Sequence, residues 1–212
     1  MTPEAQSDFI RSTCGAVPVI PVIMFNEPDR ARDLASALSS GGLTVLEVTL
    51  RTERALEIIT EMATLDASVV VGAGTLLTAR DAEAAKKAGA AFGVSPGASD
   101  AIIDAAIDVG LPLLPGAVTA SEMMRLLDRG YSAQKFFPAE ASGGAKALAS
   151  FAAPLPQVSF CPTGGIGPAN ARDYLDLPNV MCVGGSWMLD KEAISGGDWP
   201  NIAKAARAAS AV

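Results

Sequence analysis

The stretch Ala133-Gln134-Lys135-Phe136-Phe137-Pro138-Ala139-Glu140 places one lysine within an apolar run that is typical of a buried strand. The other five lysines lie in polar or alanine-rich segments, at Lys86, Lys87, Lys146, Lys191 and Lys204. Beside Phe136 and Phe137, the amine of Lys135 would lose water, which favours its neutral, nucleophilic form. Lys135 is therefore a candidate for Schiff-base chemistry on a carbonyl substrate. The alternative is a structural lysine that reaches from the strand end into water.

Similar apolar runs recur along the chain, and the gaps between them carry alanine- or leucine-rich helical patterns. The eight runs span 17–24, 45–51, 69–75, 92–97, 111–117, 133–139, 159–166 and 181–187. Near-continuous apolar character indicates strands that are buried on both faces, as in a parallel sheet covered by helices. Eight such units in 212 residues predict an α/β fold, a single-domain (β/α)₈ TIM barrel over 1–212. We also expect a short N-terminal helix at 4–13.

Charge and cysteine content limit the partners and the compartment. The net charge of −7 argues against nucleic acid, which needs a basic face, but local cations still allow an anionic small-molecule substrate. Three cysteines in apolar surroundings, Cys14, Cys161 and Cys182, indicate reduced thiols rather than a disulfide framework. No signal-peptide pattern and no run of about 18 apolar residues is present. We expect a cytoplasmic protein that does not bind membranes.

The sequence contains no histidine. This absence removes the usual general base and the commonest zinc ligand, so proton transfer must fall to carboxylates, lysine, tyrosine or water. The three cysteines show no metal-ligand spacing. We therefore expect neither a metal nor another cofactor.

Three polar side chains alternate with apolar ones in the second run. Glu47, Thr49 and Arg51 share one face of a strand, because side chains alternate with a period of two. If the apolar set packs under the helices, a carboxylate and a guanidinium point into the barrel, where unpaired charge is expensive. We interpret this as a functional pocket. An internal Glu47–Arg51 ion pair is the structural alternative.

Two Gly-Gly pairs follow consecutive predicted strands. The sequences are Thr163-Gly164-Gly165-Ile166 and Val183-Gly184-Gly185-Ser186, at the positions where many barrels bind phosphate through backbone N–H groups. Tight turns are the alternative, and the absence of a G-x-G-x-x-G pattern argues against a dinucleotide. Together with Lys135 and Glu47, the pairs suggest imine chemistry on a phosphorylated keto acid, in which Glu47 transfers protons and Arg51 binds a carboxylate.

Six short strings resemble one known family, that of 2-dehydro-3-deoxy-6-phosphogluconate (KDPG) aldolase and 4-hydroxy-2-oxoglutarate (KHG) aldolase. They are Leu-Glu-Val-Thr-Leu-Arg-Thr-Glu (46–53), Val-Gly-Ala-Gly-Thr (71–75), Val-Ser-Pro-Gly (94–97), Lys-Phe-Phe-Pro-Ala-Glu (135–140), Cys-Pro-Thr-Gly-Gly-Ile (161–166) and Val-Gly-Gly-Ser-Trp (183–187). The resemblance runs from about residue 17 to the C-terminus. It implies a class I aldolase of the Entner–Doudoroff pathway, a homotrimer of (β/α)₈ barrels that yields pyruvate and glyceraldehyde 3-phosphate.

The resemblance also assigns roles to individual residues. It implies that Lys135 is the Schiff-base lysine and that Glu47 is the acid–base glutamate. The pyruvate end would be lined by Arg51, Thr75, Pro96, Phe137 and Thr163. The phosphate would bind at Gly164, Gly165, Gly185 and Ser186. The loop at 24–28 and the pair Ala117-Val118 depart from the family pattern, which leaves the substrate range open if either touches the substrate.

Three other functions are compatible with parts of the pattern. A metal-dependent aldolase would lose activity with chelators. A non-catalytic phosphosugar-binding barrel would leave Lys135 unmodified by a keto acid under reducing conditions. A biosynthetic barrel that moves a phosphoryl-bearing group would not form a covalent adduct with pyruvate.

Overall fold

The computed structural model describes residues 1–212, in which short strands alternate with helices. The strands are β1 (Val19–Ile23), β2 (Val45–Thr49), β3 (Val70–Gly74), β4 (Phe92–Val94), β5 (Leu113–Leu114), β6 (Gly116–Ala117), β7 (Ala133–Phe136), β8 (Ser159–Pro162) and β9 (Val183–Gly185). The helices are α1 (Pro3–Cys14), α2 (Ala31–Ser40), α3 (Ala55–Ala63), α4 (Ala79–Lys87), α5 (Asp100–Asp108), α6 (Ala120–Asp128), α7 (Gly144–Ser150), α8 (Ala171–Leu175), α9 (Lys191–Gly196) and α10 (Trp199–Ser210). Two 3₁₀ turns, η1 (Pro28–Arg30) and η2 (Glu140–Ser142), complete the set. None of the helices combines the length and the apolar character needed to cross a membrane.

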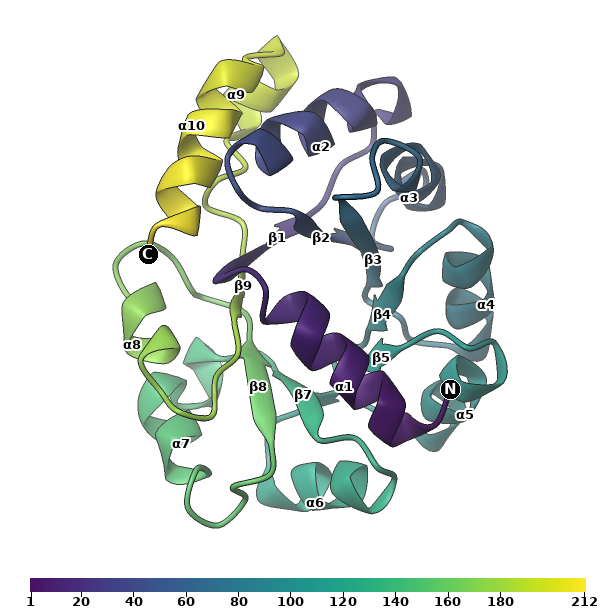
Figure 1. Cartoon of the computed structure of the whole chain (residues 1–212), viewed down its shortest axis with the longest axis vertical. Coiled ribbons are helices and arrows are strands. Elements are labelled where there is room, and N and C mark those ends of the chain that lie inside the picture. Colours follow the sequence, from purple (N-terminus) through teal and green to yellow (C-terminus); the bar gives the residue numbers. More distant parts are fainter.

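All strand pairs are parallel, and they form two sheets. Six strands follow the order β5-β4-β3-β2-β1-β9, and three follow the order β6-β7-β8. The sheets curl around a common centre, with most of the helices outside (Figure 1). Two isolated bridges, Thr163 to Gly184 and Phe160 to Val180, connect the two sheets where β8, at the end of one, lies beside β9, at the end of the other. The predicted parallel α/β architecture is therefore confirmed as a curled sheet.

The fifth predicted run is divided into β5 and β6 at Pro115. Proline has no N–H to donate to a sheet ladder, so the strand is interrupted there. The carbonyl of Pro115 still accepts a hydrogen bond from the N–H of Lys135 at 2.8 Å. This bond fixes the backbone of the lysine at the second residue from the end of β7.

Helix α1 lies across one end of the curled sheet (Figure 1) and is held there by polar side chains. Gln6 is fully buried and accepts hydrogen bonds from the N–H of Leu113 at 3.1 Å and the hydroxyl of Tyr131 at 2.9 Å. Ser7 accepts from the N–H of Ser132 at 3.1 Å. These partners precede or begin their strands, so α1 covers the amino ends of the strands and leaves the carboxyl ends open.

Two apolar clusters lie on the two faces of the strands. The larger one contains Leu46 and Val48 and packs between the sheet and the outer helices. The smaller one fills the inside of the curl next to α1 and includes Ile10, Ile20, Val45, Phe92 and Leu114, with the three cysteines. The apolar set of the second predicted run therefore packs under the helices, as its alternation with Glu47 and Thr49 indicated. The inner cluster closes the floor beneath the open end.

The predicted strand ends need correction. Strand β2 stops at Thr49, so Arg51 lies in the following turn with an exposed side chain rather than on the strand face. Strands β7 and β8 likewise stop at Phe136 and Pro162, well before the ends of the predicted runs. The residues beyond these ends have strand-like composition, but they form the loops that surround a pocket.

Candidate active site

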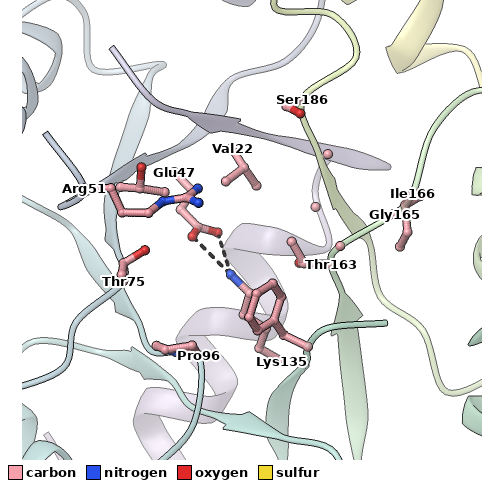
Figure 2. Close-up of a pocket in the computed structure, with 15 residues that line it drawn as sticks. Val22, Glu47, Arg51, Thr75, Pro96, Lys135, Thr163, Gly165, Ile166 and Ser186 are labelled. Carbon is pink, nitrogen blue, oxygen red and sulfur yellow. Dashed lines mark hydrogen bonds and ion pairs between the residues drawn. The ribbon is translucent and has the colours of Figure 1, made fainter. Parts of the chain in front are cut away.

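A cavity of about 300 Å³ opens at the carboxyl ends of the strands (Figure 2). Every residue predicted for the site lines it: Glu47, Arg51, Thr75, Pro96, Lys135, Phe137, Thr163, Gly164, Gly165, Gly185 and Ser186. Four further residues complete the lining, namely Val22, Thr49, Ile166 and Gly184. The structure thus brings together residues from seven strands or the loops that follow them.

The centre of the pocket is an ion pair between Lys135 and Glu47. The Nζ atom of Lys135 lies 3.1 Å from Oε1 and 3.3 Å from Oε2 of Glu47, and the two side chains are only 7% and 5% exposed. Nζ also lies 5.5 Å from the centroid of the Phe137 ring. Lys135 therefore does not reach into water as a structural lysine would. The amine and a proton acceptor are held together, and both side chains are almost fully buried.

Gly74 at the end of β3 makes room for the carboxylate. A Cβ atom at this position would lie 2.2 Å from Oε1 and 2.7 Å from Cγ of Glu47. Gly72, two residues earlier on β3, also lies close to a neighbouring side chain. A Cβ there would lie 2.3 Å from the Phe92 ring. The carboxylate of Glu47 can lie over β3 beside Lys135 only because Gly74 carries no side chain.

Arg51, Thr75 and Pro96 line one side of the pocket (Figure 2). Thr75 has φ of 64°, a left-handed conformation that is strained for a β-branched residue and that is found mostly at functional sites. Arg51 forms no ion pair, and Glu47 pairs with Lys135 instead. The alternative of an internal Glu47–Arg51 pair is therefore wrong. The guanidinium is left free to bind an anion at this side.

Thr163 lies between the lysine and the opposite side of the pocket (Figure 2). Its Oγ1 is buried and has no hydrogen-bond partner in the protein. The residue is also packed against Gly184, where a Cβ would lie 2.4 Å from Oγ1. A buried hydroxyl without a partner is costly, so this atom is a natural contact for a bound ligand.

The two Gly-Gly segments and Ser186 form the other side of the pocket, remote from Arg51 (Figure 2). Gly164 and Gly165 have φ of 103° and 77°, conformations that glycine adopts easily. The N–H groups of Gly164, Gly165, Ile166 and Ser186 donate to no backbone acceptor. Successive unpaired N–H groups in such a turn form a concave site for an anion.

Three thiols lie in the inner cluster below the pocket, and all are free and buried. The pKa of Cys161 is lowered by a hydrogen bond with Cys182 and by the nearby charge of Lys135, against the effect of burial. The pKa of Cys182 is raised by that same hydrogen bond and by burial, and burial also raises the pKa of Cys14. The thiol of Cys161 thus senses the charge of Lys135, its partner in register on β7.

The segments that depart from the family pattern lie outside the pocket. Neither the loop at 24–28 nor Ala117-Val118 contributes to the lining. Val22, which does contribute, was missed by the sequence analysis, although its position on the first apolar run was a signal. No three His, Cys, Asp or Glu side chains are grouped so that they could hold a metal ion.

The fold and the pocket define a class of site. A buried lysine paired with a carboxylate, between a free arginine and a set of unpaired N–H groups, can form an imine with an anionic carbonyl compound. The carboxylate can transfer protons, and the two sides can bind two anionic groups.

Comparison with known proteins gives the family. Residues 10–205 match the family described as "Aldolase: KDPG and KHG aldolase", and the chain belongs to this family. It is 47% identical over 194 residues to 2-dehydro-3-deoxy-phosphogluconate aldolase of Pseudoalteromonas atlantica, which covers 92% of this chain and 90% of the relative. It is 48% identical over 192 residues to KHG/KDPG aldolase of Escherichia coli, covering 91% and 90% of the two chains.

Solved structures agree with this assignment. The chain superposes with a TM-score of 0.91 and 43% identity on KDPG aldolase from Legionella pneumophila, which holds pyruvate captured at low pH as a covalent carbinolamine intermediate; the match covers 94% of this chain and 97% of the other. The TM-score is 0.90, with 44% identity, for the Zymomonas mobilis aldolase with 3-phosphoglycerate, covering 97% and 96%. The family recognised from the sequence strings is confirmed.

Proposed function

We propose that the protein is a class I aldolase that cleaves KDPG to pyruvate and D-glyceraldehyde 3-phosphate. We include 4-hydroxy-2-oxoglutarate, which yields pyruvate and glyoxylate, as a second substrate. The observation that carries the proposal is the buried contact of 3.1 Å between Nζ of Lys135 and Oε1 of Glu47. The relatives named KDPG aldolase and KHG/KDPG aldolase support the same two substrates.

The first step is attack of Lys135 on the keto carbon of the substrate. Glu47 can accept one proton from the ammonium across their hydrogen bond, which leaves a neutral amine beside a neutral carboxylic acid. The amine adds to the carbonyl and forms a carbinolamine. Glu47 then returns the proton to the departing hydroxyl, and loss of water gives the iminium. The pyruvate carbinolamine in the Legionella relative supports this step.

The second step breaks the bond between C3 and C4. The iminium draws the bonding electrons toward nitrogen, while Glu47 takes the proton from the C4 hydroxyl, so that the aldehyde leaves and an enamine remains. The same carboxyl group then protonates C3. Addition of water to the resulting iminium releases pyruvate and restores Lys135. Glu47 is suited to these transfers, because both of its oxygens lie within 3.3 Å of the lysine nitrogen to which the substrate would be attached.

The two sides of the pocket would bind the two charged ends of KDPG. Arg51 can take the carboxylate of the pyruvate half through its planar fork, with Thr75, Pro96, Phe137 and Thr163 around the keto carbon. The free N–H groups at Gly164, Gly165 and Ser186, next to Gly185, would take the phosphate. The phosphoglycerate in the Zymomonas relative is consistent with a phosphorylated ligand.

We further propose one closed (β/α)₈ barrel, formed as a single domain and assembled as a homotrimer. The bridges between Thr163 and Gly184 and between Phe160 and Val180 support closure at one seam, and the separation of β5 from β6 by one residue supports it at the other. The family resemblance supports the trimer, which light scattering during size-exclusion chromatography would test. The three free thiols support a location in the cytoplasm, where reducing conditions keep thiols free.

A coupled assay tests the reaction. The enzyme is mixed with KDPG. Each product, pyruvate or glyceraldehyde 3-phosphate, is then measured with a coupling dehydrogenase that is specific for it. We expect equal amounts of the two products, at a rate that EDTA does not change. Lack of cleavage would favour the phosphosugar-binding barrel, and loss of activity with EDTA would favour the metal-dependent aldolase.

A further inference from the structure

Glu140, the first residue of the 3₁₀ turn η2, contacts the Gly164–Gly165 turn on the side away from the pocket. The N–H of Glu140 donates to the carbonyl of Gly164 at 3.1 Å, and the N–H of Ala139 donates to that of Thr163 at 2.8 Å. The side chain of Glu140 packs on Gly165, where a Cβ would lie 2.6 Å from its Cγ and 2.7 Å from its Cβ. The glutamate therefore contacts the turn but does not line the pocket.

Helix α8 and the residue that precedes it complete this support with two side chains one turn apart, Tyr174 and Asn170. The hydroxyl of Tyr174, a fully buried residue, donates to Oε1 of Glu140. Burial and this hydrogen bond raise the pKa of Tyr174. Asn170 donates through Nδ2 to the carbonyl of Gly165 at 3.1 Å and accepts from the N–H of Gly167 at 2.8 Å. The carbonyls of the turn thus all have partners, whereas its N–H groups, on residues that line the pocket, donate to no backbone acceptor.

We propose that Glu140 and Tyr174, assisted by Asn170, are positioning residues that set the specificity for phosphorylated substrates. The inference rests on the proposed function, because it deepens the phosphate end of that site. Two adjacent glycines have no side chain to hold their conformation and lose much entropy when they are ordered. A turn that is already fixed by neighbouring contacts binds an anion without that cost, and its donors stay aimed.

Tyr174→Phe is the sharpest variant, because it removes one hydroxyl and keeps the buried ring. Loss of its hydrogen bond to a carboxylate should loosen the turn and raise KM for KDPG about tenfold, with little change in kcat. Cleavage of 4-hydroxy-2-oxoglutarate, which has no phosphate, should stay at the wild-type rate. Borohydride trapping of pyruvate should also be unchanged.

The chain offers a matched control in Tyr131→Phe. Tyr131 is the other tyrosine; it is fully buried too and also donates a hydrogen bond, but to Gln6 at the opposite end of the strands. Both variants should lower Tm, and only Tyr174→Phe should change the preference between the substrates. Two substitutions of Glu140 separate the effect of its negative charge from the effect of its contacts. Glu140→Ala removes the acceptor and the packing, and should act like Tyr174→Phe, whereas Glu140→Gln keeps both and should remain near wild type.

The outcomes distinguish this inference from the function on which it rests. A wild-type enzyme that cleaves both substrates equally well would overturn the phosphate end of the site together with its support. The positioning role alone is wrong in two cases, both with a wild type that prefers KDPG. In one, Tyr174→Phe and Glu140→Ala lose activity equally on both substrates; in the other, they lose activity on neither substrate. A selective rise in KM for KDPG in these two variants supports it.

Discussion

Replacement of Gly74 by alanine tests how closely the Lys135–Glu47 geometry controls turnover. The new Cβ would lie 2.2 Å from Oε1 of Glu47, whereas ordinary contact begins at 3.4 Å, so the carboxylate must move by about 1 Å. Gly74 ends β3 and lacks a positive φ, so alanine itself fits the backbone. A displacement of about 1 Å in a catalytic group lowers turnover by about 100-fold. We expect that loss in kcat, with a smaller change in KM.

The measurement is the coupled pyruvate assay on Gly74→Ala, with Tm recorded in parallel. Overpacking should cost about 1–3 kcal/mol, which for this chain length corresponds to a fall of several degrees in Tm. Gly97→Ala is the matched control, because it follows the neighbouring strand and a Cβ there meets nothing within 4 Å. A folded Gly74→Ala enzyme with kcat within about twofold of wild type would refute a geometry-dependent role for Glu47.

Four further predictions concern single residues. Lys135→Ala should reduce cleavage to background and, by leaving Glu47 buried without its partner, lower the free energy of unfolding by about 3 kcal/mol in denaturant titrations. Glu47→Gln should lower kcat about 100-fold with little effect on KM, and a change confined to KM would contradict its acid–base role. Ser186→Glu should raise KM for KDPG at least about tenfold through charge repulsion, but not KM for 4-hydroxy-2-oxoglutarate; equal losses would argue against a phosphate there. Burial raises the pKa of Tyr131 to about 12 from a usual value of 10.0. The unfolded state therefore loses its proton first, and stability should fall between pH 10 and about 12, less steeply in Tyr131→Phe.

The fold was predictable because burial on both faces leaves a pattern in the sequence. Each apolar run contains at least one strand, and the N-terminal helix, expected at 4–13, spans Pro3–Cys14. The ends of the strands were not predictable, since Phe137 and Ile166 are as apolar as strand residues but line the pocket. The break at Pro115 was also missed, although proline cannot donate within a ladder.

The pocket was predictable for a related reason. Lys135 and Glu47 are 88 residues apart, but parallel strands bring their carboxyl ends to one edge, and alternation sets which side chains face inward. The residues that position the pocket side chains showed no recognisable pattern in the sequence. Gly74 resembles an ordinary turn glycine, and Tyr174 belongs to a helix of five residues, which is too short for a periodic pattern. The roles of the pocket residues stay predictions until variants are measured.

Reductive trapping tests the central claim most directly. The enzyme is incubated with saturating pyruvate and borohydride, digested, and analysed by mass spectrometry of the peptides. We predict one pyruvate-derived adduct per chain, on the peptide that contains Lys135, and none on the other five lysines. An unmodified Lys135, or an adduct on another lysine, would contradict the imine mechanism.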